Sequence, residues 1–150
     1  MTTIAIKDGV VASDSMQTGY FIDQVNAVKT KKLKRISDCQ TVIVGGAGTF
    51  SEVHQFMDWV EYSCNKEDYI SSNDRDSTLF VVDSEGVWKY DTYYKPIYSG
   101  KMSAFGSGAQ FAMGAMMAGA TAEEAVRIAI ELDTNSGRDV VTLRLEYYYD

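Results

Sequence analysis

The chain of 150 residues is poor in the side chains that build metal centres and disulfide frameworks. It has one histidine, His54, and two cysteines, Cys39 and Cys64. Zinc sites and disulfide frameworks need several such residues at close, recurring spacings. We therefore expect no metal site and no disulfide scaffold, and the low cysteine content favours a reducing compartment.

Long apolar runs are lacking as well. Nowhere do 18 apolar residues follow one another, and the first residues lead into an alternating, strand-like pattern instead of a basic segment and an apolar core. A membrane span needs the first feature and a secretory signal the second. We expect a cytoplasmic protein without a membrane partner.

Basic side chains are in the minority, with 14 Lys and Arg against 21 Asp and Glu and a formal net charge of −7. A field of this sign does not attract nucleic-acid phosphates or anionic lipids. The glycine-rich segments 45–48 and 105–108 lack the lysine and the spacing of nucleotide-binding loops. We expect neither a nucleic-acid partner nor a cofactor.

The composition, 45% hydrophobic and 23% charged, is typical of a folded chain, and the length suits one domain over residues 1–150. Alternating and apolar segments predict hairpins and strands at 2–14, 41–44, 78–90 and 140–145. Helical spacing of apolar residues predicts helices over 49–64, 107–120 and 121–134. This irregular order favours an α+β fold of antiparallel sheets layered with helices, because a parallel sheet needs regular βαβ alternation.

We do not expect histidine catalysis, since no nucleophile elbow or cysteine signature accompanies His54. The start of the chain offers another nucleophile. Removal of Met1, expected before a small second residue, exposes Thr2 with a free α-amine. A threonine hydroxyl reacts only when a base takes its proton, and an α-amine with a pKa of about 7.7 to 8.0 is such a base. Thr2 can therefore supply both the nucleophilic hydroxyl and the base.

Six segments of the sequence resemble, in the same order, those of proteasome β-type subunits and HslV peptidases, which are N-terminal nucleophile hydrolases. They are TTIA (2–5), VASD (11–14), KKLKRI (31–36), VIVGGAG (42–48), GSG (106–108) and DTNSG (133–137). Each segment is common by itself. Six of them in register, spread over nearly the whole chain, make a strong resemblance.

The resemblance implies a role for seven residues. Thr2 is the nucleophile and, through its amine, the general base. Lys32 lowers the pKa of this amine, with Lys31 as the alternative, and Asp14 orients the lysine. The N–H of Gly45 forms the oxyanion hole. Three further residues, Ser107, Asp133 and Ser136, hydrogen-bond around the amine. Taken singly, these positions also fit turns and a helix end; together they favour the catalytic interpretation.

The same resemblance implies a four-layer αββα sandwich and stacked rings of six or seven subunits. It implies a threonine endopeptidase that hydrolyses peptide bonds in a closed chamber, on unfolded polypeptides that a separate ATPase delivers. Thr18 then lies on the edge that pairs with substrate. Thr30, Ile43 and Ala47 are weaker candidates for a specificity pocket that takes small, apolar side chains.

The sequence departs from the family pattern between residues 48 and 78, where it predicts one helix instead of two. We therefore expect weak or absent coupling to an ATPase unfoldase. Two other functions stay open: a non-catalytic ring or scaffold protein that retains Met1, and a small-molecule amidase of the same fold. The aromatic segment Tyr147-Tyr148-Tyr149 either extends the final strand or packs on a neighbouring subunit.

Overall fold

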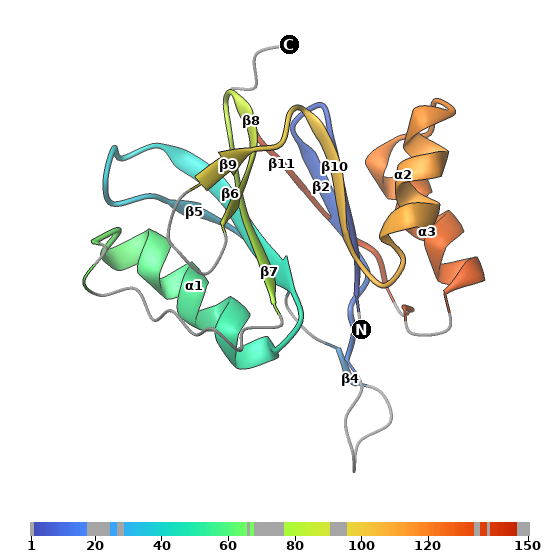
Figure 1. Ribbon diagram of the computed structural model, residues 1–150, viewed down its shortest axis with the longest axis horizontal. Helices are drawn as coiled ribbons and strands as arrows, with labels where there is room; N and C mark the ends of the chain where they lie inside the picture. The colour runs from blue at the N-terminus through green and yellow to red at the C-terminus, as the bar shows by residue number, and fades with distance from the viewer. Residues whose placement is uncertain are drawn as a thin grey trace.

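Four layers make up the protein in the computed structural model, which describes residues 2–17, 25–26, 29–65, 67, 77–90, 96–133, 136–137 and 139–146. A helix covers the outer face of one sheet, a second sheet packs on its inner face, and two helices cover the far side of that second sheet (Figure 1). The predicted α+β class and the αββα order of layers are confirmed.

The second sheet holds the N-terminal hairpin. Its strand order is β10-β1-β2-β11, and all neighbours are antiparallel. The strands are β1 (Thr3–Lys7), β2 (Val10–Ser13), β10 (Met102–Gly106) and β11 (Val141–Arg144). The predicted turn between β1 and β2 is present, and both of its central residues, Asp8 and Gly9, have positive φ as a two-residue hairpin turn requires.

The other large sheet has the strand order β5-β6-β7-β8-β9 and is also antiparallel. Its strands are β5 (Thr30–Lys34), β6 (Thr41–Ala47), β7 (Thr78–Asp83), β8 (Gly86–Tyr90) and β9 (Pro96–Tyr98). Two short strands, β3 (Met16–Gln17) and β4 (Val25–Asn26), pair with each other. The sequence did not predict β5, because four lysines and arginines in six residues hide its alternation.

Three described helices form the outer layers. Helix α1 (Phe50–Tyr62) covers the five-stranded sheet, and α2 (Ala109–Met117) and α3 (Ala122–Leu132) cover the other sheet. A capping box is present at the start of α3, with reciprocal bonds between Thr121 and Glu124. None of the helices in the described part of the chain is long and apolar enough to cross a membrane.

Three apolar clusters separate the four layers. One lies between the sheets and contains Ile4, Ile43 and Phe80; a second lies under α1, and the third, rich in alanine, lies under α2 and α3. Small side chains such as Ala5 and Ala129 let these two helices approach their sheet closely. Buried polar residues, among them Asp14 and Lys29, lie outside these clusters, at the end of β2 and just before β5.

Candidate active site

Asp14 is the centre of a buried polar cluster at the end of β2. Its side chain is fully buried and accepts three hydrogen bonds. Its Oδ1 accepts from the Thr3 N–H at 3.0 Å and from Lys29 Nζ at 2.8 Å, and its Oδ2 accepts from the Gly137 N–H at 3.0 Å. The carboxylate therefore fixes the backbone next to Thr2, the lysine and the segment after α3 in one place.

Lys29, which directly precedes β5, is the lysine of this cluster. Burial lowers the pKa of its ammonium below the usual value near 10.5; the hydrogen bond and charge of Asp14 and the charge of Asp133 partly offset this effect. The side chain is 6% exposed. A buried cation held by a carboxylate favours the neutral form of an amine close by.

The prediction that Asp14 orients Lys32 is wrong, and the alternative Lys31 is not at the site either. Alternation along β5 turns Lys31 to the α1 side, where it pairs with Glu61 at 3.0 Å. Lys32 points between the sheets but lies farther from Asp14 along the strand, and it pairs with Glu146 at 3.9 Å. Lys29 holds the place that the motif assigned to Lys32.

A chain of hydroxyl and carboxylate groups links Thr2 to the end of α3. The Ser107 Oγ donates to Asp133 Oδ2 at 2.6 Å and lies 3.3 Å from the carbonyl oxygen of Thr2. The Ser136 Oγ donates to the same carboxylate oxygen at 2.7 Å and lies 2.7 Å from Thr3 Oγ1. The structure thus brings together the three residues expected to surround the amine. Met1 itself lies outside the described residues.

Two glycines let the loop after β10 approach Thr2 and Thr3. A Cβ at Gly106, whose φ is +98°, would lie 2.0 Å from the Thr2 carbonyl oxygen. A Cβ at Gly108 would lie 1.9 Å from Thr3 Oγ1. The GSG segment is therefore needed for close packing around the start of β1, in addition to the hydroxyl of Ser107.

Gly108→Ala should destabilise the protein by about 1–3 kcal/mol, because the new methyl group overlaps the Thr3 hydroxyl and forces the loop away. Gly114→Ala is the matched control. Position 114 lies within α2 with nothing near its Cβ, so alanine there should stabilise by about 1 kcal/mol. Urea unfolding of the two variants gives both values; equal stability of the two would contradict the contact.

Gly45 has a clear packing role in β6. A Cβ there would lie 2.7 Å from the Lys29 carbonyl oxygen and 2.8 Å from Phe80 Cζ. The N–H of Gly46 donates to that carbonyl at 3.3 Å, so alternation turns the Gly45 N–H toward β7. The role of Gly45 as an oxyanion donor stays a prediction.

The specificity candidates lie on different parts of the sandwich. Thr30 is buried beside Gly45, and within the described part of the chain its Oγ1 has no hydrogen-bond partner. Ile43 is fully buried in the cluster between the sheets, and Ala47 is at its border. Thr18 lies outside the described residues. Thr30 and Ala47 are also buried, so the role of all three residues in a specificity pocket stays a prediction.

Sequence reasoning missed Lys29 although a usable signal was present. The two strands at 30–34 and 41–47 form a hairpin, and pairing counted back from its turn places Lys29 opposite Gly46. The glycine-rich end of β6 and the end of β2 lie at the same end of the sandwich. A lysine at the start of this hairpin is therefore nearer to Asp14 than one in its middle.

The fold that holds these groups together is similar to the folds of solved structures. Thr2 directly precedes β1, a buried lysine–aspartate pair lies beside it, and a serine–aspartate–serine chain contacts its backbone. HslV from Trypanosoma brucei shares 22% identity over 97% of this chain and 100% of that chain, with a TM-score of 0.62. The chain has an HslV-like fold.

The HslV-like fold also matches bacterial proteins called BPH. Thiobacillus denitrificans BPH in complex with epoxomicin shares 17% identity with this chain, covers 99% of both chains and has a TM-score of 0.66. Another structure of BPH from that organism has 19% identity and a TM-score of 0.59. No protein-family model and no curated protein sequence matches the chain. At these identities the likeness concerns the fold.

The sequence predicts that one helix of the family is missing after α1. Between residues 48 and 78 the described residues form α1, which ends at Tyr62. Residues 66 and 68–76, where a second helix of the family would follow, lie outside the described residues. The prediction of a shortened outer layer therefore stays a prediction.

Proposed function

We propose that the protein is the threonine-type peptidase subunit of a self-compartmentalising ring protease. Removal of Met1 gives Thr2 a free amine; the amine takes the proton of the Thr2 hydroxyl, directly or through one water, and the oxygen attacks the substrate carbonyl. The proton then passes to the leaving amine, and water releases the acyl group from Thr2. The observation that carries this proposal is the buried Lys29–Asp14 pair, which shares one carboxylate oxygen with the Thr3 N–H.

Lys29 has two tasks in this mechanism. Its charge favours the neutral amine of Thr2, which is the form that accepts a proton. The same charge stabilises the negative oxygen that develops during attack, because the site is buried and weakly screened. Asp14 acts through Lys29 and is a positioning residue: its second oxygen is held by the Gly137 N–H, so the ammonium cannot turn away.

Ser107, Asp133 and Ser136 hold the start of β1 in place in this proposal. Ser107 contacts the Thr2 carbonyl, and Asp133 accepts from both serines. A nucleophile on a chain end loses much of its advantage unless its backbone is fixed. These hydrogen bonds add to the bond that Asp14 accepts from the Thr3 N–H.

The HslV-like fold supports a proposal for the assembly and the substrates. We propose stacked six- or seven-membered rings of this subunit in the cytoplasm, with unfolded polypeptides as substrates and small, apolar side chains at the cleaved position. We further propose weak or absent coupling to an ATPase unfoldase. Robust ATP-dependent degradation with an HslU-type ATPase would contradict the last point.

Exchanging Thr2 tests the nucleophile. Thr2→Ala should abolish turnover of a fluorogenic peptide amide, whereas Thr2→Ser, which keeps the amine and a hydroxyl, should retain a measurable rate. Light scattering should show the same assembly for both variants. Full activity of Thr2→Ala would contradict the role of Thr2.

The two other functions predict different results in the same experiment. A small-molecule amidase would cleave simple amides, leave peptides intact and run as a monomer in light scattering. A scaffold protein would form rings, retain Met1 and turn over neither substrate. The buried cation beside the N-terminal strand supports the peptidase, because a scaffold has no need of a desolvated lysine there.

A further inference from the structure

Thr3, the residue that follows Thr2, is held at three points. It is fully buried at the start of β1. Its N–H donates to Asp14 Oδ1 at 3.0 Å, its carbonyl oxygen accepts the N–H of Asp14 at 3.1 Å, and its side-chain Oγ1 lies 2.7 Å from Ser136 Oγ. Any residue except proline can make the two backbone bonds. The third bond needs a hydroxyl, so it is the contact that depends on the side chain at this position.

The direction of this third hydrogen bond follows from the acceptor at its far end. Each hydroxyl has one proton to donate, and an ionised carboxylate only accepts. The Ser136 Oγ donates its proton to Asp133 Oδ2 at 2.7 Å. The Thr3 hydroxyl is therefore the donor to Ser136 Oγ. Because the bonds lead in one direction to a charged acceptor, they strengthen one another.

These contacts close a ring around the start of β1. The N–H of Gly137, the residue after Ser136, donates to Asp14 Oδ2 at 3.0 Å, while Asp14 Oδ1 accepts from the Thr3 N–H. Thr3 is thus bound to Asp14 through its backbone and to Ser136 through its side chain. The ring joins the Lys29–Asp14 pair to the serine–aspartate–serine chain. The Thr3 hydroxyl is the member of the ring that can be removed without loss of a charge.

We propose that Thr3 is a positioning residue, whose bond to Ser136 fixes the place of Thr2. The inference rests on the proposed function, in which the Thr2 amine must lie close to the Lys29 ammonium. Once Met1 is removed, Thr2 is joined to the chain on one side only, through residue 3. Its orientation therefore depends on how firmly residue 3 is held, and small displacements of a reacting group reduce the rate strongly.

Close packing around the Thr3 hydroxyl leaves no ready substitute for this bond. A Cβ at Gly108 would lie 1.9 Å from Thr3 Oγ1 and 3.2 Å from the Cβ of Ala129, so the hydroxyl lies against the backbone of the GSG segment. The Gly108 N–H also donates to the Thr2 carbonyl at 3.4 Å. A shift of this segment after loss of the hydroxyl therefore moves Thr2 as well. The fold should survive, because one neutral hydrogen bond contributes little to the stability of a domain.

Three substitutions of Thr3 test the role of the hydroxyl. Serine keeps the donor and loses a methyl group, alanine loses both, and valine keeps the branched shape without the donor. In turnover of a fluorogenic peptide amide, Thr3→Ser should keep most of the wild-type kcat. Thr3→Ala and Thr3→Val should each lose about 10–100-fold in kcat with KM unchanged. If one of these two fails to fold, the other makes the same comparison with Thr3→Ser.

The pH profile of kcat/KM separates positioning from a general loss of structure. The Thr2 amine must be neutral to accept a proton, and the charge of Lys29 lowers the pKa of this amine. Asp14 and Asp133, the carboxylates of the cluster, oppose this effect. An amine that moves away from Lys29 has a pKa closer to the ordinary value of about 7.7–8.0. The acidic limb of the profile should therefore shift to higher pH in Thr3→Ala and stay in place in Thr3→Ser; an unshifted limb in Thr3→Ala would overturn the proposal.

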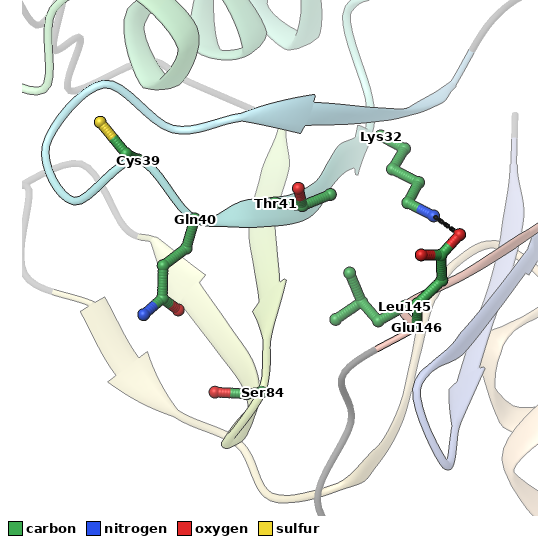
Figure 2. Close-up of a pocket in the computed structure, with 7 residues that line it drawn as sticks. All are labelled: Lys32, Cys39, Gln40, Thr41, Ser84, Leu145 and Glu146. Carbon is green, nitrogen blue, oxygen red and sulfur yellow. Dashed lines mark ion pairs between the residues drawn. The ribbon is translucent and has the colours of Figure 1, made fainter.

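Thr41 provides the matched control, because it lies in β6 at the other end of the sandwich. It lines a pocket between the two sheets together with Lys32 and Leu145 (Figure 2). Leu145 donates its N–H to the carbonyl of Gly9 in the β1–β2 turn, whereas Thr3 is at the opposite end of β1. Thr41 is exposed. Thr41→Ala removes the same atoms as Thr3→Ala and should leave kcat and the pH profile unchanged.

Three further results would overturn the role of Thr3: an unchanged kcat in Thr3→Ala or Thr3→Val, an equal loss in Thr3→Ser, and an equal loss in Thr41→Ala. The wild-type protein and Thr2→Ala in the same assay distinguish this failure from failure of the proposed function. An inactive wild type or a fully active Thr2→Ala contradicts the proposed function, and the role of Thr3 with it. An active wild type, an inactive Thr2→Ala and a fully active Thr3→Ala contradict only the role of Thr3.

Discussion

Lys29→Ala lowers the turnover of a fluorogenic peptide by about 10²–10⁴-fold, the range in which general base and charge-stabilisation effects fall. Lys32→Ala leaves turnover within a factor of about two, because an exposed pair held at 3.9 Å contributes little. The physical reason is position: Lys29 shares Asp14 with the backbone of residue 3, and Lys32 faces the opposite end of the sandwich.

The two variants distinguish between two assignments of the lysine at the site, because the family motif assigns Lys32 and the structure places Lys29 beside Asp14. Both variants lose one ammonium from the same short segment, so a general effect of charge would move them equally. Circular dichroism and light scattering confirm that fold and assembly are kept. A large loss in Lys32→Ala with normal turnover in Lys29→Ala would restore the assignment made from the motif and contradict the geometry.

Asp14→Ala has the largest expected effect on stability. It leaves the Lys29 ammonium buried without its carboxylate, and it removes the acceptor of two backbone N–H groups, those of Thr3 and Gly137. Breaking a buried pair in this way costs about 3–5 kcal/mol, which lowers Tm by roughly 10 °C for a chain of this size. Thermal unfolding followed by circular dichroism measures the shift.

The loss in Asp14→Ala should shrink as the pH rises. Burial lowers the pKa of Lys29 below that of the unfolded chain, and without Asp14 the main group that opposes this effect is gone. Between the two pKa values the unfolded state binds more protons, so the stability of the variant increases with pH as the buried amine becomes neutral. A constant loss between pH 7 and pH 10 would show that the charge of Lys29 is not its cause.

Lys29→Met is the control for Asp14→Ala. Methionine fills the space of the aliphatic stem, and Asp14 keeps its bonds to the two backbone N–H groups. We therefore expect less than half of the destabilisation seen in Asp14→Ala, although both variants lose activity. Equal destabilisation would mean that the backbone bonds of Asp14 contribute nothing.

The parts of the fold that sequence could predict are those with strong local patterns. The Asp8–Gly9 turn fixed the first hairpin, the apolar face of α1 fixed that helix, and the Thr121–Glu124 capping box fixed the start of α3. The helix predicted at 107–120 exposes one side: Met117 is 72% exposed. Its buried residues, Ala112 and Met116, lie on one face of the helix, and composition alone does not tell one buried face from two.

The sequence could predict those parts of the site that the order of motifs along the chain identifies without knowledge of how the strands pair. Ser107, Asp133 and Ser136 are joined by hydrogen bonds and Asp14 bonds to Thr3 and Gly137, while the catalytic roles that the resemblance implied for them stay predictions. The lysine of the site could not be identified from the sequence. Adjacent residues of a strand face opposite sides, and a motif of four lysines and arginines leaves the register of the strand open. The choice of Lys29 depends on how β5 pairs with β6, which is a long-range property.

The most direct test of the central claim is the intact mass of the natively expressed protein before and after exposure to an electrophile that is selective for an N-terminal threonine. The account predicts a chain that lacks Met1 and gains one adduct, which maps to Thr2 and is strongly reduced in Lys29→Ala. A chain that retains Met1 and forms no adduct would contradict it, because Thr2 would then be an internal residue without a free amine.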